Sequence, residues 1–500
     1  MIWRVVVGQR IGIDYHNPLG FGPFEVGALL WQWFGPRYYV MRVAIAVFSL
    51  LIALCGCIVA KRALAHRPDL ALLFCVTLAF QVSGPSVYET SPRELGMVGF
   101  YDRHIVSALA VLFLQTFGNR PILSKRDNAI EVGLAACLLN IMFLIKISGF
   151  LLGLMILLAG CLLRGRTGHR LLNLCAALAV FAAITAIEFK ITGLELTPII
   201  QDYELAAHAR LVYSFYGVVN GVFSWPLVSS VTLLVFFAFS QGAELPLDFR
   251  CVGLIIGSYS ACQIAVNMTN AWGPSMWLAP AAVACLAGCP SVTADARQMA
   301  GAENFWRKFS LSRLSKISAR QAIPLVIFTL VLAPEVVASV FGTAVGALES
   351  IGIRLPYAVT AGKGVRFRSF VSRLGPPAYD RSLNDAVAAI TSLKLDHEAI
   401  ATLDFANPFP VLFLAPPPKG IHVWWDWGVT VPRGSVFEWQ SVIGDACVTM
   451  VPVQPSEPDV TGRLVEFVQS KLATDFKVVY QDSSWSIYRR TQDCATAPHI

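Results

Sequence analysis

Long apolar runs alternate with short polar segments between residues 39 and 345. A run of about 18 or more apolar residues can cross the roughly 30 Å of hydrocarbon in a bilayer as a helix. Four runs meet this test well, namely 39–60, 171–190, 222–241 and 322–345. Shorter runs lie between them, at 69–83, 105–118, 128–145, 149–163, 251–268 and 275–289. The pattern predicts an α-helical polytopic membrane bundle with about ten transmembrane helices.

The two ends of the chain have a different pattern. Residues 346–500 read like a water-soluble protein, with helical periodicity over 383–394 and 459–476. Strand character falls at 400–405, 447–453, 477–480 and 485–488. We therefore predict three parts: a first external segment at 1–38 with an interfacial helix, the bundle at 39–345, and a C-terminal external α/β or α+β domain at 346–500.

Charge supports this arrangement and gives it a direction. Only 14% of the residues are charged, whereas a soluble domain carries roughly 25%. Every second loop between the apolar runs is basic, as the positive-inside rule expects of cytoplasmic loops. The basic residues of these loops include Arg62, Arg67, Arg120, Lys125, Arg126, Arg164, Arg166, Arg170, Arg307 and Lys308. The net charge of +7 therefore indicates topology and not nucleic-acid binding, and both ends of the chain are expected outside.

Two features leave alternatives open. No signal peptide begins at residue 1, so either the N-terminus reaches the outside without one or an upstream span is missing from the gene model. Ten of the twelve cysteines lie in or beside apolar runs, where they act as small hydrophobic residues. Cys447 and Cys494 fall in the external domain, as either a disulfide or two buried thiols. No Cys-x-x-Cys motif suggests zinc.

Candidate chemistry gathers in the external segments. Asp14 and His16 lie two residues apart before a Pro-x-Gly turn, which is either a site at the mouth of the membrane or a solvated turn. Lys146 falls near the outer end of the fourth span, where an ionisable residue is costly and usually functional unless it snorkels to the interface. The second external loop adds groups that either bind a ligand or pair with one another: Glu89, Arg93, Asp102, Arg103 and His104.

Several of these segments resemble those of one enzyme family. The stretch Asp14-Tyr-His16-Asn-Pro18-Leu-Gly20 resembles the Asp-Phe-x-x-Pro-x-Gly pattern in the first external loop of bacterial type C glycosyltransferases. Tyr101-Asp102-Arg103-His104 resembles a Tyr-Asn-Arg-x segment of related membrane proteins, with Asp in place of Asn, and Lys146-Ile-Ser-Gly-Phe150 resembles a following Lys-x-x-x-Phe segment. The tail resembles the external domain of that group at Asp404–Phe409, Pro416–Gly420, Trp424-Trp425 and Trp485–Arg490.

The resemblance implies a function. Such enzymes are polytopic and use a polyprenyl-phosphate sugar donor, so this chain is expected to be a glycosyltransferase of the bacterial inner (cytoplasmic) membrane and the cell envelope. It would transfer a hexosyl or pentosyl group to an external, periplasmic acceptor, which is a glycan, a lipid or a protein. No cofactor is certain, and dependence on a divalent metal stays open.

The resemblance also implies roles for individual residues. Asp14 would act as the general base, and His16 would position the substrate. Cationic side chains would hold the donor phosphate, with acidic neighbours beside them; this set is Arg93, Arg103, His104, Lys146, Glu89 and Asp102. We expect Asp14 and at least one of these cations to line one external cavity.

Two other classes of function remain as alternatives. A transporter or flippase of lipid-linked glycans would show internal repeats and broken helices with charges near the midplane. The sequence has no such repeat, and its unusual charges lie near the outer surface. A membrane scaffold with an external binding domain is the third possibility. The sugar and the acceptor are not identified by the sequence.

Overall fold

The computed structural model of the chain describes residues 1–17, 20–35, 40–65, 68–83, 86–87, 95–96, 100–118, 124–163, 167–211, 219, 222–242, 248–269, 278–287, 359–360, 366–367, 376–404, 407–423, 443–453, 472–491 and 494. The chain divides into two compact units. The first unit contains Met1–Ile45, Phe189–Tyr213 and Glu349–Ile500, and the second contains Ala46–Glu188 and Ser214–Leu348. Residues from both ends of the chain thus belong to one unit, together with Phe189–Tyr213.

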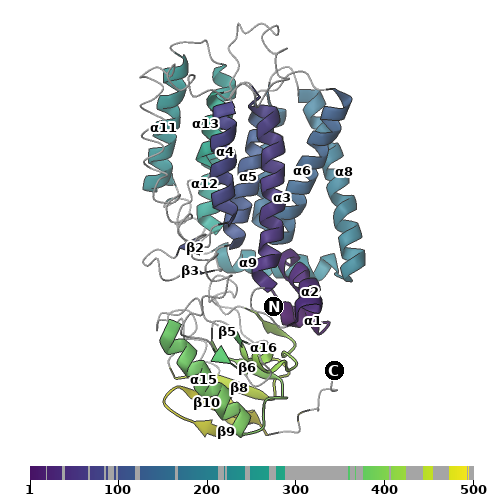
Figure 1. The fold of residues 1–500 in the computed structure, drawn as a ribbon, viewed down its shortest axis with the longest axis vertical. Helices are drawn as coiled ribbons and strands as arrows, with labels where there is room; N and C mark the ends of the chain where they lie inside the picture. Colours follow the sequence, from purple (N-terminus) through teal and green to yellow (C-terminus); the bar gives the residue numbers. More distant parts are fainter. Residues whose placement is uncertain are drawn as a thin grey trace. The chain divides into compact units, whose positions relative to one another are not determined.

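The second unit is helical, and its long helices run alongside one another (Figure 1). Their bounds are α3 (Val40–Ala63), α4 (Pro68–Ser83), α5 (Phe100–Phe117), α6 (Lys125–Ile145), α7 (Ile147–Cys161), α8 (Thr167–Thr192), α11 (Trp225–Gly242), α12 (Phe249–Thr269) and α13 (Ala279–Ala287). Strands β2 (Ser86–Val87) and β3 (Leu95–Gly96) pair antiparallel.

Helix α5 lies at the centre of this bundle, packed against α4, α6, α7, α12 and α13. Every residue from Ala108 to Leu114 is almost completely buried. Helices α3 and α8 instead expose apolar side chains, such as Leu50 at 60% and Leu172 at 65%. A helix that is apolar on its outward face as well as its inward face is typical of a membrane span.

Four helices among the described residues are long and apolar enough to cross a membrane: Val43–Ala63, Lys125–Ile145, Gly168–Thr192 and Phe249–Val266. Shorter apolar helices lie at Leu70–Ser83, Ile147–Cys161 and Leu227–Phe239. The expected count of about ten spans is not confirmed by these helices. The run at 322–345 lies outside the described residues.

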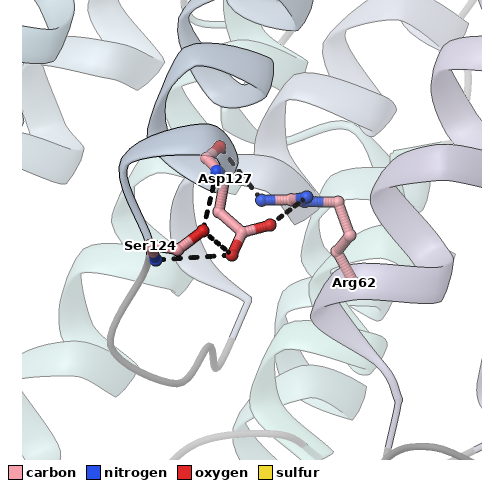
Figure 2. Close-up of polar contacts among 3 residues, drawn as sticks. All are labelled: Arg62, Ser124 and Asp127. Carbon is pink, nitrogen blue, oxygen red and sulfur yellow. Dashed lines mark hydrogen bonds and ion pairs between the residues drawn. The ribbon is translucent and has the colours of Figure 1, made fainter.

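One of the basic residues expected in cytoplasmic loops, Arg62, joins the end of α3 to the start of α6. The Ser124 side chain accepts a hydrogen bond from the Asp127 backbone N–H at 3.2 Å, and the Asp127 carboxylate accepts one from the Ser124 backbone, which closes a capping box on α6 (Figure 2). Arg62, in the last turn of α3, donates to the same carboxylate at 2.8 Å (Figure 2). Arg62 therefore contributes to helix packing as well as to the charge of this end of the bundle.

The first unit combines elements of the N-terminal segment and α9 with a small mixed α/β layer built from the tail. The elements of the whole unit are α1 (Ile2–Val6), β1 (Tyr15–His16), α2 (Gly22–Phe34), α9 (Leu196–Leu211), β4 (Val359–Thr360), β5 (Arg366–Phe367), α15 (Pro376–Ser392), β6 (Ile400–Thr402), α16 (Phe409–Phe413), β7 (Ile421–His422), β8 (Val448–Pro452), β9 (Phe476–Gln481) and β10 (Trp485–Arg490). Four strands form a sheet in the order β6-β8-β10-β9, with β6 parallel to β8 and the other pairs antiparallel.

Helix α15 covers this sheet and supplies six of the seventeen buried residues in its core (Figure 1). Leu383 and Ile390 of α15 are fully buried, as is Trp485 of β10. The Trp485 ring meets Phe409 edge-on at a centroid distance of 5.6 Å, and its indole N–H donates to the Ser382 carbonyl at 2.9 Å. The mixture of helix and strand predicted for 346–500 is present, whereas 459–471 lies outside the described residues.

Cys447, the residue before β8, forms a disulfide with Cys494. The Cα atoms of the pair are 5.7 Å apart, within the usual range for a bridge. Of the two alternatives that the sequence left open, the structure has the disulfide.

Candidate functional site

The segment carrying Asp14 and His16 is held by the far end of the chain. Strands β1 and β7 run parallel, with Tyr15 opposite Ile421 and His16 opposite His422. The Gly420 N–H donates to the Asp14 carbonyl at 2.7 Å, which extends this pairing by one residue. The backbone of the segment is therefore anchored on both sides of Tyr15, with Asp14 at the end of a turn and His16 in the strand.

The proline-rich stretch that precedes β7 is fixed by side chains of the N-terminal segment. Proline has no N–H, but its carbonyl remains an acceptor. The Arg4 guanidinium donates to the Pro418 carbonyl at 2.6 Å, and the Gln9 amide donates to the Pro417 carbonyl at 2.6 Å. Arg4 also lies over the Tyr15 ring at 5.2 Å. These contacts set the position of β7 beside β1.

Burial affects the charge on Arg4. It lowers the pKa of the guanidinium to about 10, although Tyr15, Asp445 and Asp14 nearby oppose this shift. The pKa still lies far above neutral pH, so Arg4 remains a cation under the proline-rich stretch.

His16 pairs with a carboxylate from α9. Its Nδ1 lies 2.7 Å from Oδ1 of Asp202, and the other carboxylate oxygen accepts the Asn17 N–H at 2.9 Å. Asp202 is 4% exposed, whereas the His16 side chain is 36% exposed. Among the described residues, Nε2 of His16 has no hydrogen-bond partner.

A second imidazole packs on the first. The rings of His16 and His422 have centroids 5.1 Å apart and an interplanar angle of 37°. Burial, followed by the proximity of His16, lowers the pKa of His422 to about 3. His422 is therefore neutral at physiological pH and places no positive charge against His16.

Asp14 is committed to other contacts. Its Oδ1 lies 3.0 Å from Nζ of Lys419, and its Oδ2 accepts the Arg10 N–H at 2.8 Å. Burial alone would raise the pKa of this carboxyl, but the hydrogen bonds from Arg10 and Lys419 outweigh burial and leave the pKa lowered. Asp14 is thus an ionised carboxylate with a cationic partner.

In the second unit, Lys146 lies at the break between α6 and α7, where its extended backbone ends one helix and begins the next. Its Nζ donates to Oδ1 of Asp102 at 2.9 Å and lies 5.1 Å from the centre of the Tyr101 ring. Lys146 is only 7% exposed, so its ammonium group is paired inside the unit and does not snorkel.

The two residues after Asp102 have different surroundings. Nε and Nη1 of Arg103 are buried without a hydrogen-bond partner among the described residues. His104 is 1% exposed, and its Nε2 lies 2.9 Å from the Ser49 hydroxyl, which itself donates to the Val82 carbonyl at 2.8 Å. Because that hydroxyl proton is used on Val82, His104 donates to Ser49 and ties α3, α4 and α5 together.

The expected site residues fall into two groups. Asp14 and His16 belong to the first unit, while Asp102, Arg103, His104 and Lys146 belong to the second. Their convergence on one cavity stays a prediction. Glu89 and Arg93 lie outside the described residues, as do the tryptophans at 424, 425 and 427.

Three contributors to the site were not predicted as such. Asp202 and Lys419 stood only inside a polar loop and a proline-rich motif, and His422 had no signal in the sequence. A possible metal cluster in the described part of the chain is Glu398 with Cys447 and Cys494. The two sulfurs of that cluster are already joined to each other, so it is not a metal site.

No family model matches the chain, and no curated protein matches it. Among solved structures, it is similar to the crystal structure of ArnT from Cupriavidus metallidurans bound to undecaprenyl phosphate. That likeness has 15% identity and a TM-score of 0.47, and it covers 100% of this chain and 93% of ArnT. The apo state of the same ArnT gives 13% identity and a TM-score of 0.45, covering 97% and 91%. With TM-scores below 0.5, the likeness decides neither the fold nor the reaction.

Proposed function

We propose that this protein is a membrane glycosyltransferase that moves a sugar from a polyprenyl-phosphate carrier to an acceptor on the external side. One observation carries the proposal. The motif at 14–20 and the motif at 416–420, which both resemble type C glycosyltransferases, meet at the Asp14–Lys419 ion pair and the β1–β7 pairing. Two motifs 400 residues apart in sequence would not need to meet if each were an independent turn.

The chemistry of transfer needs a base and a cationic site. The acceptor hydroxyl loses a proton as it attacks an anomeric carbon that becomes oxocarbenium-like, as in glycoside hydrolysis. The first unit offers Asp14 and His16 for that proton. The phosphate leaves with negative charge, which fixed cations stabilise.

The second unit offers cations for the phosphate. Lys146 is a buried ammonium held by Asp102, and Arg103 carries two guanidinium nitrogens without a partner among the described residues. A guanidinium fits a phosphate with two parallel hydrogen bonds. Arg93 belongs to the same proposed set with Glu89 as an acidic neighbour, whereas the tie to Ser49 makes His104 a positioning residue.

The setting agrees with a lipid-linked donor. The exposed apolar side chains of α3 and α8 suit contact with lipid tails. Helix α2 exposes Leu29 at 59% and Trp33 at 80%, which suits the membrane interface. The Cys447–Cys494 disulfide suits an oxidising compartment, so the tail belongs on the periplasmic side of the inner membrane in this proposal.

One observation favours the transporter as a second candidate. The break between α6 and α7 places a buried ion pair, Lys146 with Asp102, at a helix interruption. Interrupted helices with charged groups are typical of substrate sites in transporters. Cleavage of the sugar–phosphate bond distinguishes the two functions.

The test uses purified full-length protein in liposomes with a panel of radiolabelled polyprenyl-phosphate hexoses and pentoses. A transferase releases polyprenyl phosphate when an external glycolipid acceptor is added. A flippase moves the labelled lipid between leaflets and leaves the bond intact, which would contradict the proposal.

A substitution at Arg103 tests the cationic site. Arg103→Lys keeps the charge but loses the planar fork, so KM for the donor should rise about 10-fold, a loss of one good polar contact. The matched control is Arg126→Lys at the exposed start of α6, which should leave KM unchanged. An unchanged KM in Arg103→Lys would remove Arg103 from the site.

A further inference from the structure

The arrangement around His16 separates the roles of the two candidate bases. We propose that the imidazole of His16, and not the carboxylate of Asp14, takes the proton of the acceptor, and that Asp202 on α9 is the residue that positions His16. This inference rests on the proposed function and assigns the proton transfer within it.

Asp202 fixes the tautomer of His16. A carboxylate accepts hydrogen bonds and cannot donate them, so Nδ1 of His16 must carry the proton in the 2.7 Å contact with Asp202. Nε2 then carries the lone pair, and this atom has no hydrogen-bond partner among the described residues. An orienting carboxylate behind a histidine with a free nitrogen is the arrangement by which proteins prepare a general base.

The fold holds Asp202 firmly in this position. Its second oxygen accepts the Asn17 N–H at 2.9 Å, so two donors from adjacent residues fix one buried carboxylate. One turn earlier in α9, Pro198 lies against Gly12, where an added Cβ would be 2.6 Å from the proline side chain. Gly12 has φ of +75°, a value that favours glycine. Close contact at Gly12 therefore sets the distance between α9 and β1.

Asp14 is a poorer proton acceptor. Both of its carboxylate oxygens are engaged, one by Lys419 and one by the Arg10 N–H, and its pKa is lowered by these contacts. A base of lower pKa takes a proton less readily at neutral pH. Asp14 instead fixes Lys419, whose own N–H donates to Asp445 at 2.7 Å. These contacts hold the register that brings His422 to His16.

The neutral state of His422 is useful in this step. Transfer of a proton to His16 creates an imidazolium, and a second positive ring 5.1 Å away would oppose it. Burial keeps His422 uncharged, while the carboxylate of Asp202 stabilises the new charge.

The reaction balances as one displacement. The acceptor oxygen forms a bond to the anomeric carbon and gives its proton to Nε2 of His16. The bond from the anomeric carbon to the phosphate oxygen breaks, and the electron pair leaves with the polyprenyl phosphate. Asp202 stays ionised throughout, and the imidazolium returns its proton to water before the next cycle.

The first experiment compares variants in the donor assay. In Asp202→Asn, the amide oxygen still accepts the Asn17 N–H, so the NH₂ group faces Nδ1 of His16 and forces the proton onto Nε2. We expect kcat to fall about 10²- to 10⁴-fold with KM changed less than about 3-fold. The kcat of His16→Gln should fall by a similar factor. The kcat of Asp202→Glu should lie between those of Asp202→Asn and the wild type. Glu204→Gln, on the exposed side of the same helix, is the matched control.

The comparison with Asp14 decides between the two bases. Asp14→Asn should lower kcat by less than about 10-fold, because its role is to hold Lys419. A larger loss in Asp14→Asn than in His16→Gln overturns the proposal, and so does near-normal turnover in Asp202→Asn. Failure of the wild-type protein on every donor would instead overturn the proposed function itself.

A second experiment does not need the donor. Diethylpyrocarbonate acylates an unprotonated imidazole nitrogen, and peptide mass spectrometry of the full-length protein reads each histidine separately. In the wild type, His16 should be acylated faster than the exposed His397. In Asp202→Asn, the acylation rate of His16 should fall several-fold, while that of His397 should not change. An unchanged His16 rate in Asp202→Asn overturns the positioning role. The buried His422 should stay unreactive in the variant, which shows that the first unit remains folded.

Discussion

The two units place their ion pairs in different surroundings. In the second unit, the side chains of Lys146 and Asp102 are only 9% and 10% exposed. In the first unit, Lys419 is 60% exposed while its partner Asp14 is 16% exposed. Breaking an ion pair whose two side chains are both buried is costly, whereas an ion pair with one solvent-exposed side chain contributes little to stability. The Asp14–Lys419 pair therefore mainly orients groups beside β1, whereas the Lys146–Asp102 pair holds the interior of the second unit.

The largest expected effect comes from breaking the buried pair. Lys146→Met leaves Asp102 without its cation and should lower the free energy of unfolding by about 3–5 kcal/mol. Thermal unfolding of the detergent-solubilised protein measures this loss. Lys125→Met, at the exposed start of the same helix α6, should have no effect. The double variant Lys146→Met/Asp102→Asn should recover part of the lost stability. An unfolding midpoint unchanged by Lys146→Met alone would mean that the ion pair is not buried in the protein.

The disulfide offers a way to weaken the first unit alone. Cys447 and Cys494 close a separation of 47 residues, and loss of such a bridge costs about 2–4 kcal/mol. The free cysteines of the described residues all lie in the second unit, so a reductant should destabilise only the first. Limited proteolysis with and without reductant measures both units in one sample, and equal sensitivity of the second unit would contradict the division.

Substitutions at two glycines separate the stability cost of lost packing space from the cost of a left-handed backbone. Gly12 and Gly8 have similar φ values, +75° and +78°, but only Gly12 faces a neighbour within 4 Å. Gly8→Ala should cost about 1 kcal/mol for the left-handed backbone. Gly12→Ala should cost about 1–3 kcal/mol more, because the added methyl group must displace α9. Equal losses of stability in the two variants would show that α9 does not pack on this turn.

Periodicity in the sequence predicted the local elements well. The strands expected at 447–453 and 485–488 are β8 and β10, and the helix expected at 383–394 lies mainly within α15. These elements are set by side-chain alternation within a few residues, so the chain itself shows them. Lys146 also stood out in the sequence, because an ionisable group near an apolar run is unusual before any partner is known, and the structure buries it beside Asp102.

The partners of the site could not be predicted in the same way. Asp202 meets His16 across 186 residues of sequence, and His422 meets it across a parallel pairing of two-residue strands. Such contacts depend on tertiary packing and leave no periodic signal. The role expected for Asp14 shows the same limit, because its engagement by Lys419 is visible only once residues 14 and 419 are side by side.

The smallest expected effect is at the exposed pair, and its dependence on pH and salt tests the comparison most closely. Lys419→Met should lower the free energy of unfolding by less than about 1 kcal/mol at pH 7, because Lys419 is mostly in water. Lys477→Met, an exposed lysine on β9, is the matched control and should show no loss. Chemical denaturation of the full-length protein at several pH values measures the difference.

The sign of the pH dependence follows from Asp14. Its pKa is lowered in the folded protein, so the pair contributes stability above the unfolded carboxyl pKa of about 3.9. That contribution is lost as pH falls through the lower folded pKa, because both states then bind the proton. The gap between wild type and Lys419→Met should therefore be constant from pH 7 to about 5 and close below about pH 4. It should also shrink in 1 M salt, where the screening length falls to about 3 Å, whereas the loss caused by Lys146→Met should not. If the stability difference between wild type and Lys419→Met depended on neither pH nor salt, the Asp14–Lys419 pair would behave as a buried pair, like Lys146 and Asp102.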